Sequence, residues 1–124
     1  MKAFILAILT TTLFTSINAA NAASGKWQCT PLTTFFCSVI ACNDIPPEGW
    51  VEVDFDTNTY GLCGEKAPCV IYEMKSEPSG YMVNAFVTAI EPLLFRMTIS
   101  GDVYFEVASI GAATHQNFGS CKEL

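Results

Sequence analysis

The stretch from residue 93 to 110, LLFRMTISGDVYFEVASI, constrains the fold more than any other part of the sequence. Two runs of β-branched and aromatic residues flank a Ser-Gly-Asp break, which is the pattern of a β-hairpin. Because side chains alternate between two faces along a strand, the pattern predicts an antiparallel sheet with one buried and one solvated face. The stretch carries no motif that indicates a particular chemistry.

The register of this hairpin is predicted from its faces. A two-residue loop would set Met97 opposite Glu106 and mix apolar with charged side chains. A three-residue loop, 100–102, sets Met97 opposite Phe105 and pairs Arg96 with Glu106 on the solvated face. We therefore predict an odd loop. The predicted buried row consists of Phe95, Met97, Ile99, Val103, Phe105 and Val107.

The first 22 residues have the pattern of an export signal. Lys2 precedes an apolar run, AFILAILTTTLF, and Ala20-Asn21-Ala22 fits the A-x-A cleavage pattern. The run is shorter than the roughly 20 residues that a spanning helix needs. We predict that residues 1–22 are a removed signal peptide and that residues 23–124 form a single β domain. The predicted location is periplasmic or secreted, with no membrane segment after cleavage.

Six cysteines lie in the predicted mature chain, and an even count in a short exported chain indicates disulfides. The spacings are wider than those of common zinc motifs, so no metal site is predicted. Fifteen connectivities are possible. The best predictions are Cys63–Cys69, which closes a short loop, and Cys29–Cys121, which joins the first and last strands. The full set is Cys29, Cys37, Cys42, Cys63, Cys69 and Cys121.

The charge of the chain argues against two classes of partner. Without Lys2, five Lys and Arg residues stand against twelve Asp and Glu residues, a net charge of −7. Nucleic acids and anionic membranes are bound by basic surfaces, so neither is a predicted partner. The acidity mildly favours a cationic protein partner.

The segment 31–42, PLTTFFCSVIAC, is ambiguous. Its apolar residues have helical spacing, and Pro31 would suit the first turn of a short helix. Its β-branched and aromatic residues favour a strand instead. A bridge between Cys37 and Cys42 would exclude an intact helix, because residues five apart point in different directions around it. A strand and a turn are slightly favoured.

Two further hairpins are predicted. In residues 50–63 a turn at 57–58 sets Phe55 opposite Tyr60, with Val51, Val53 and Phe55 on the inner face. The acidic residues from Asp54 onward imitate a calcium loop poorly, since Thr59 stands where such loops need glycine. The third hairpin pairs 69–75 with 81–89 across a loop at 76–80. Its predicted inner residues are Val70, Tyr72 and Met74.

Catalytic motifs are absent from the sequence. His115 is the only histidine, and no nucleophile elbow, phosphate loop or haem motif occurs. His115 is therefore interpreted as a surface or packing residue, and no catalytic residue or cofactor is predicted. A hydrolase is the least supported function.

The predicted fold is all-β: a small antiparallel meander of about seven strands that closes into a disulfide-stapled barrel or sandwich. In size, export and acidity the chain resembles periplasmic inhibitor barrels that act on lysozyme or proteases. None of their motifs matches residue by residue, so no site is carried over. The favoured function is an exported binding module, with inhibition of a secreted or periplasmic enzyme as the expected role, and not an enzyme itself.

Exposed loops are the predicted contacts of such a module. The candidate contact residues are Asp44, Glu48, Glu65, Lys66, Glu77 and Pro78. The alternative function is a lipocalin-like carrier, because a barrel of about eight strands can hold one small ligand. A cavity of about 300 Å³ or more would favour that carrier.

Overall fold

The computed structural model describes residues 23–89 and 92–124, and the predicted signal peptide lies outside them. The described residues form ten strands and no helix. The strands are β1 (Lys26–Cys37), β2 (Cys42–Ile45), β3 (Trp50–Asp54), β4 (Thr59–Gly64), β5 (Ala67–Glu73), β6 (Lys75–Ser79), β7 (Met82–Val87), β8 (Leu93–Thr98), β9 (Tyr104–Ile110) and β10 (Ala113–Glu123).

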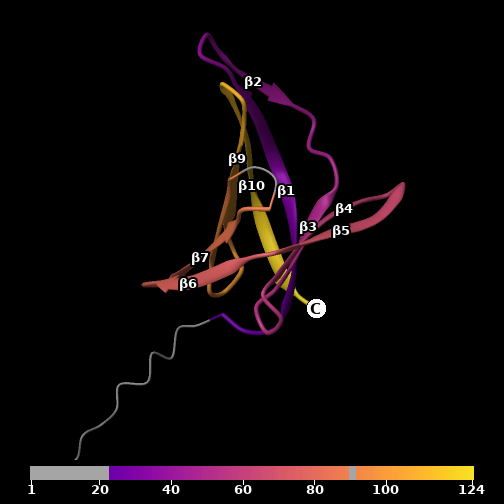
Figure 1. Ribbon diagram of the computed structural model, residues 1–124, viewed down its shortest axis with the longest axis vertical. Helices are drawn as coiled ribbons and strands as arrows, with labels where there is room; N and C mark the ends of the chain where they lie inside the picture. The colour runs from indigo at the N-terminus through magenta and orange to yellow at the C-terminus, as the bar shows by residue number, and fades with distance from the viewer. Residues whose placement is uncertain (1–22, 90–91) are drawn as a thin grey trace, which may run out of the picture.

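All strand pairs are antiparallel, in the order β5-β4-β3-β1-β10-β9-β8-β7-β6, with β2 paired to β1. The two outermost strands, β5 and β6, follow each other in the chain, with only Met74 between them. The sheet therefore curls into a half-barrel whose two ends are joined by one continuous segment (Figure 1). The predicted antiparallel, barrel-like, all-β fold is confirmed, with more strands than the seven expected.

The first and last strands lie side by side at the centre of the sheet, as predicted. β1 pairs with β10 over almost its whole length, and Cys29 stands opposite Cys121. One half of β1 also pairs with β3 and the other half with β2. Figure 1 shows the turn of the β1–β2 hairpin at the end of the molecule away from the C-terminus, slightly beyond the turn between β9 and β10.

The short helix considered for 31–42 does not form. The segment is the second half of β1, a turn and the start of β2. Cys37 and Cys42 are opposite partners in this hairpin and are bonded to each other. The β-branched and aromatic residues suit the pleated strand, and the bridge is incompatible with an intact helix.

Three disulfides cross-link the sheet: Cys29–Cys121, Cys37–Cys42 and Cys63–Cys69. Both predicted pairings are confirmed, and none of the described cysteines is free. A domain of this size with three disulfides indicates an oxidising compartment. Where the structure describes the chain, it has no helix long and apolar enough to cross a membrane.

The core lies on the inner face of the curled sheet. Val53, Phe95, Met97 and Tyr104 have no exposed surface, and Tyr60 is 1% exposed. The Phe95 ring stacks on Tyr104 at a centroid distance of 5.7 Å and meets Tyr60 edge-on at 6.4 Å. Aromatic packing from β4, β8 and β9 therefore fills the middle of the half-barrel.

The predicted register of the 93–110 hairpin is wrong by one residue. Met97 stands opposite Tyr104 and Phe95 opposite Glu106, across a four-residue turn at 99–102. Tyr104 and Glu106 therefore face inward. Phe105 and Val107 share the outer face, where the Phe105 ring packs against Phe118 at a centroid distance of 4.8 Å.

The physical reason is that the inward positions of β9 accept polar groups. The Glu106 carboxyl group is buried, and each of its oxygens accepts one hydrogen bond, so it does not need the solvated face that the alternation pattern predicted for it. The predicted Arg96–Glu106 pair does not form, because Arg96 stands opposite Phe105. Val103, predicted to be buried, is 53% exposed.

In the 50–63 hairpin the predicted inner face is confirmed, because Val51, Val53 and Phe55 are buried. The pairing differs by two residues, with Val53 rather than Phe55 opposite Tyr60. The cause is a longer turn. The Asp54 carboxylate accepts hydrogen bonds from the backbone N–H groups of residues 56 and 57, at 2.9 and 3.1 Å, and so closes a four-residue turn at 55–58.

The third predicted hairpin does not form. β5 pairs with β4, whereas β6 pairs with β7. The predicted loop at 76–80 is therefore largely strand β6, and Val70 is 52% exposed while Met74 is buried. The chain passes from one end of the sheet to the other at Met74, which a pattern of local alternation does not reveal.

Candidate functional site

The most exposed apolar residues of the described chain are at the turn of the β1–β2 hairpin. We call residues 38–41 the tip loop. Val39 is 86% exposed and Ile40 91% exposed. Two adjacent large apolar side chains that are this exposed on one turn make the tip loop a candidate contact surface.

The tip loop is held in one conformation. The Cys37–Cys42 disulfide closes its base, and the Ser38 N–H donates to the Ala41 carbonyl oxygen at 2.9 Å. The Ser38 hydroxyl oxygen also accepts from the N–H groups of Ile40 and Ala41, at 3.3 and 3.4 Å. A loop constrained in this way loses little conformational entropy when it binds.

Of the predicted contact residues, only Asp44 belongs to this hairpin. It is exposed on β2, opposite Phe35 of β1. The other contacts predicted from sequence lie outside this hairpin, and Val39 and Ile40 were not among them. The signal that was available is a Val-Ile pair enclosed by two cysteines five residues apart.

A cavity of about 290 Å³ opens on the inner face of the half-barrel, beside the aromatic core. Its walls come from β3 and β4 on one side and from β8, β9 and β10 on the other. The lining residues include Trp50, Tyr60, Leu62, Glu106, Ala108 and His115. The volume is at the lower end of the range for small-molecule sites.

A buried polar network forms one wall of this cavity. The Tyr60 hydroxyl donates to Glu106 Oε2 at 2.5 Å, and the Asn117 amide donates to Glu106 Oε1 at 2.7 Å. The Thr34 hydroxyl donates in turn to Asn117 Oδ1 at 2.6 Å. The four residues come from β4, β9, β10 and β1, so the network ties together strands that are far apart in the sequence.

The surroundings of Glu106 disfavour its charge. Burial raises the pKa of the Glu106 carboxyl group above its ordinary 4.5, although the hydrogen bonds from Tyr60 and Asn117 and the nearby His115 act in the opposite direction. Burial and the Glu106 charge also raise the pKa of the Tyr60 and Tyr104 hydroxyls. His115, interpreted from sequence as a surface or packing residue, is half-buried and lines the cavity.

A second, wider groove of about 740 Å³ adjoins the cavity and shares Glu48 and Trp50 with it. Three predicted contact residues, Glu48, Glu65 and Lys66, line this groove together. Glu77 and Pro78 do not join them, because they lie on β6 at the far edge of the sheet.

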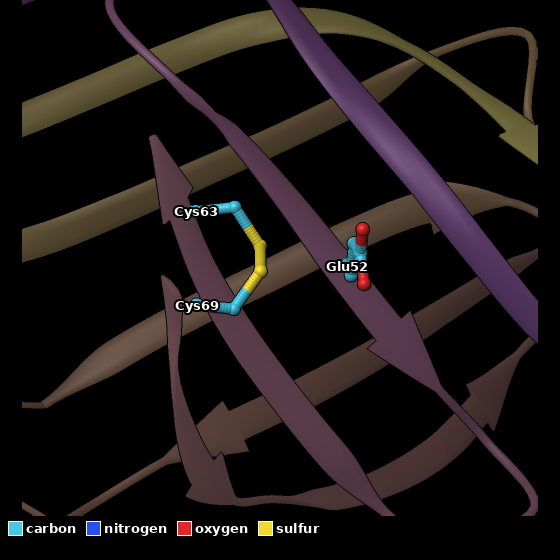
Figure 2. A group of neighbouring side chains, drawn as sticks. All are labelled: Glu52, Cys63 and Cys69. Atoms are coloured by element: carbon cyan, nitrogen blue, oxygen red, sulfur yellow. A yellow bond between two sulfur atoms is a disulfide. The ribbon is translucent and has the colours of Figure 1, made fainter. Parts of the chain in front are cut away.

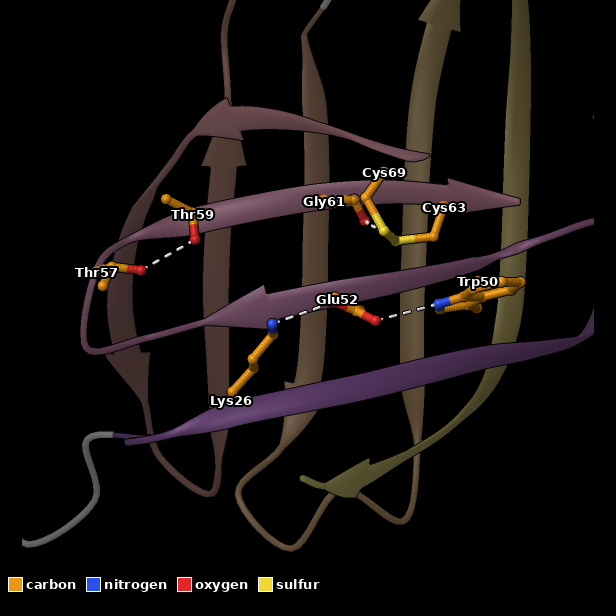
Figure 3. A network of polar contacts seen from close by, with 8 residues as sticks. All are labelled: Lys26, Trp50, Glu52, Thr57, Thr59, Gly61, Cys63 and Cys69. Atoms are coloured by element: carbon orange, nitrogen blue, oxygen red, sulfur yellow. Dashed lines mark hydrogen bonds and ion pairs between the residues drawn. A yellow bond between two sulfur atoms is a disulfide. The ribbon is translucent and has the colours of Figure 1, made fainter. Parts of the chain in front are cut away.

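The Trp50 ring is positioned by a short chain of polar contacts (Figure 3). Its Nε1–H donates to Glu52 Oε1 at 3.4 Å, and Glu52 Oε2 lies 3.3 Å from the Lys26 ammonium group. The contact joins β1 to β3 beside the cavity wall. The indole is therefore oriented by the strands rather than by a loop.

One group of potential metal ligands, Glu52, Cys63 and Cys69, lies close together on β3, β4 and β5. Figure 2 shows the two sulfur atoms bonded to each other, with Glu52 on the adjacent strand. Metal binding by cysteine requires thiolates, so the disulfide removes two of the three ligands. The Asp54 carboxylate of the calcium-like stretch is occupied by the two backbone N–H groups of its turn.

Comparison of the chain with protein-family models, with curated proteins and with solved structures finds no match. The tip loop and the cavity are therefore the two features from which a function can be inferred.

Proposed function

We propose that this chain is an exported binding module of the inhibitor type, which contacts a protein partner through the tip loop. The observation that carries the proposal is the pair of almost fully exposed apolar side chains, Val39 and Ile40, on a turn closed by a disulfide. Burying exposed apolar surface contributes about 25 cal/mol per Å² before the costs of association. The rigid turn keeps those costs low.

The proposed partner has an apolar pocket with a cationic rim. The apolar pocket would receive Val39 and Ile40, and the rim would face the exposed carboxylate of Asp44 on the same hairpin. The net charge of −6 would favour encounter with a basic protein. The export pattern of residues 1–22 and the three disulfides support a partner in the periplasm or outside the cell.

The test compares two Val-Ile pairs of the same chain. The variant Val39→Ser/Ile40→Ser removes the apolar side chains of the tip loop. The control variant Val70→Ser/Ile71→Ser removes another adjacent Val-Ile pair, which lies on β5 and is 52% and 58% exposed. A photo-reactive amino acid at position 40 should cross-link one partner from the exported fraction, and one at position 71 should not. The purified partner should bind the Val70/Ile71 variant normally and the tip variant at least tenfold more weakly. Equal binding by both variants would contradict the proposal.

The cavity supports a second candidate function, that of a small-ligand carrier. Its volume of about 290 Å³ is close to the 300 Å³ at which small-molecule sites begin, and most of its lining is apolar. Ala108 contributes to the lining from β9. A bulky residue there, Ala108→Phe, should fill the cavity and abolish small-molecule binding without affecting the tip loop.

A further inference from the structure

The cavity contains a buried carboxyl group, that of Glu106, which forms no ion pair in the described part of the chain. Glu106 is only 4% exposed, and its two hydrogen-bond donors, Tyr60 and Asn117, are neutral. The one ion pair in residues 23–89 and 92–124 joins Lys26 to Glu52 instead. A buried carboxylate is costly unless a positive charge or a proton compensates it.

The network leaves Glu106 able to accept another donor. Each carboxylate oxygen accepts one hydrogen bond in the network, and each has a second lone pair. Glu106 is one of the residues that line the cavity. A ligand inside the cavity can therefore reach it.

The rest of the lining suits an organic cation. Trp50 and Tyr60 are aromatic members of the lining, and aromatic rings attract cations, while Leu62 and Ala108 add apolar surface. At about 30 Å³ per water-sized group, a cavity of about 290 Å³ holds roughly ten non-hydrogen atoms. An inorganic ion would leave most of this space unfilled.

We propose that the cavity binds a small organic ammonium ion, with its charged nitrogen against Glu106 and its apolar body between Trp50 and Leu62. The inference rests on the second candidate function, because it names the ligand class of the carrier site. It is independent of the tip loop.

The pH dependence of binding follows from the groups around the carboxylate. Tyr60 from β4 and His115 from β10 act on Glu106, Glu106 acts in turn on Tyr104 from β9, and Glu48 lies elsewhere on the cavity wall. Acid protonates Glu106, which removes the negative charge that would attract a cation. Affinity for an ammonium ion should therefore rise as pH increases from 5 to 8.

The experiment uses three probes of similar size: benzylammonium, benzyl alcohol and benzoate. Binding to the folded, oxidised protein is measured by calorimetry at pH 5 and pH 8 and is followed through Trp50 fluorescence. Benzylammonium should bind at pH 8 at least tenfold more tightly than benzyl alcohol, and benzoate should bind most weakly. Affinity for benzylammonium should fall at pH 5, whereas affinity for benzyl alcohol should not change.

Two carboxylates provide matched variants. Glu106→Gln is expected to weaken benzylammonium binding at least tenfold and to change benzyl alcohol binding less than twofold. Glu73→Gln, on the exposed part of β5, should change neither. Circular dichroism checks that each variant is folded. Because the pH comparison uses the unchanged protein, the inference stays testable if Glu106→Gln does not fold.

The possible results distinguish failure of the ammonium specificity from failure of the carrier function. Benzyl alcohol or benzoate binding as tightly as benzylammonium would leave a carrier site and overturn its ammonium specificity. No binding of any probe would overturn both. Ammonium binding that survives Ala108→Phe would place the ligand outside the cavity and overturn the assignment.

Discussion

Glu106 connects three strands through two hydrogen bonds, and its position decides how β9 is oriented. Turning β9 by one residue would expose Glu106 and bury Phe105, but it would break the bonds to Tyr60 and Asn117. It would also separate Phe105 from Phe118 on the outer face. At the scale of single residues, a satisfied polar network is therefore compatible with an inward-facing charge.

The Thr34 hydroxyl supports this network from β1. Thr34→Val should cost about 1–3 kcal/mol in the free energy of unfolding, because Asn117 Oδ1 loses its buried donor at nearly constant side-chain volume. The neighbouring Thr33→Val, on the more exposed face, should change stability by less than about 0.5 kcal/mol. Urea unfolding measures both. Equal effects would mean that the Thr34 hydrogen bond contributes little.

Glu106 should also make stability depend on pH. Its pKa is raised in the folded protein, so between pH 4.5 and that raised value the folded state binds more protons than the unfolded state. The stability contribution is therefore complete below pH 4.5 and is lost as pH rises through the folded pKa. Urea unfolding of wild type and Glu106→Gln at a series of pH values should show this loss in wild type only. The same dependence of stability on pH in both proteins would show that Glu106 is not the group responsible.

Gly101 occupies a position that no other residue fits. Its φ is +79°, and an added Cβ would lie 2.5 Å from the Trp27 ring and 2.8 Å from the Cys121 carbonyl oxygen. Gly111 has a similar φ of +60° but nothing within 4 Å of that position. Both alanine variants incur the left-handed strain of about 1–2 kcal/mol. Gly101→Ala should cost about 2 kcal/mol more in thermal or urea unfolding because of the overlap.

At the scale of strands, the β1–β2 hairpin joins the sheet through β1, which pairs with β10, whereas β2 pairs with β1. The Cys37–Cys42 bridge closes only a short loop. Its removal by Cys37→Ser/Cys42→Ser should therefore lower the free energy of unfolding by about 2 kcal/mol. The barrel should stay folded, while the tip loop loses its fixed conformation. Partner binding should weaken even though far-ultraviolet circular dichroism is unchanged. Unimpaired binding would show that the rigidity of the tip loop is unimportant.

The hairpins show which parts of the fold could be predicted from sequence. The type of element and the inner face of β3 followed from alternation, and the Cys63–Cys69 bridge followed from spacing. The register of β8 and β9 did not, because it depends on Asn117 and Tyr60, which come from distant strands. The break between β5 and β6 at Met74 was missed because β6 has the sequence KSEPS, which is typical of a loop and which was interpreted as the turn of a hairpin.

Only some of the candidate contact residues could be predicted from sequence. Glu48, Glu65 and Lys66 were expected on loops, and the fold gathers them around one groove. Glu77 and Pro78 were assigned to a loop that is a strand. The burial of Glu106 is a tertiary property, since the local pattern assigned it to the solvated face, and the exposure of Val39 was not predicted.

At the scale of the whole molecule, the Cys29–Cys121 bridge carries the largest cross-linking effect. It closes a segment of 92 residues, so Cys29→Ser/Cys121→Ser should cost about 4–5 kcal/mol, roughly twice the effect expected for the Cys37–Cys42 bridge. Such a loss is comparable to the total stability of many small domains. Urea unfolding of the two double variants measures the ratio. A larger loss from the local bridge would contradict the loop-entropy explanation.

The same bridge determines how the molecule would respond to mechanical force. Near the ends of the described chain, β1 and β10 run antiparallel, with Trp27 opposite Glu123 and Cys29 opposite Cys121. Pulling the two ends apart would unzip these strands one residue pair at a time and would stop at the covalent bond. Tension would then pass through the sulfur atoms, and the enclosed barrel, with its cavity and its tip loop, would carry no load.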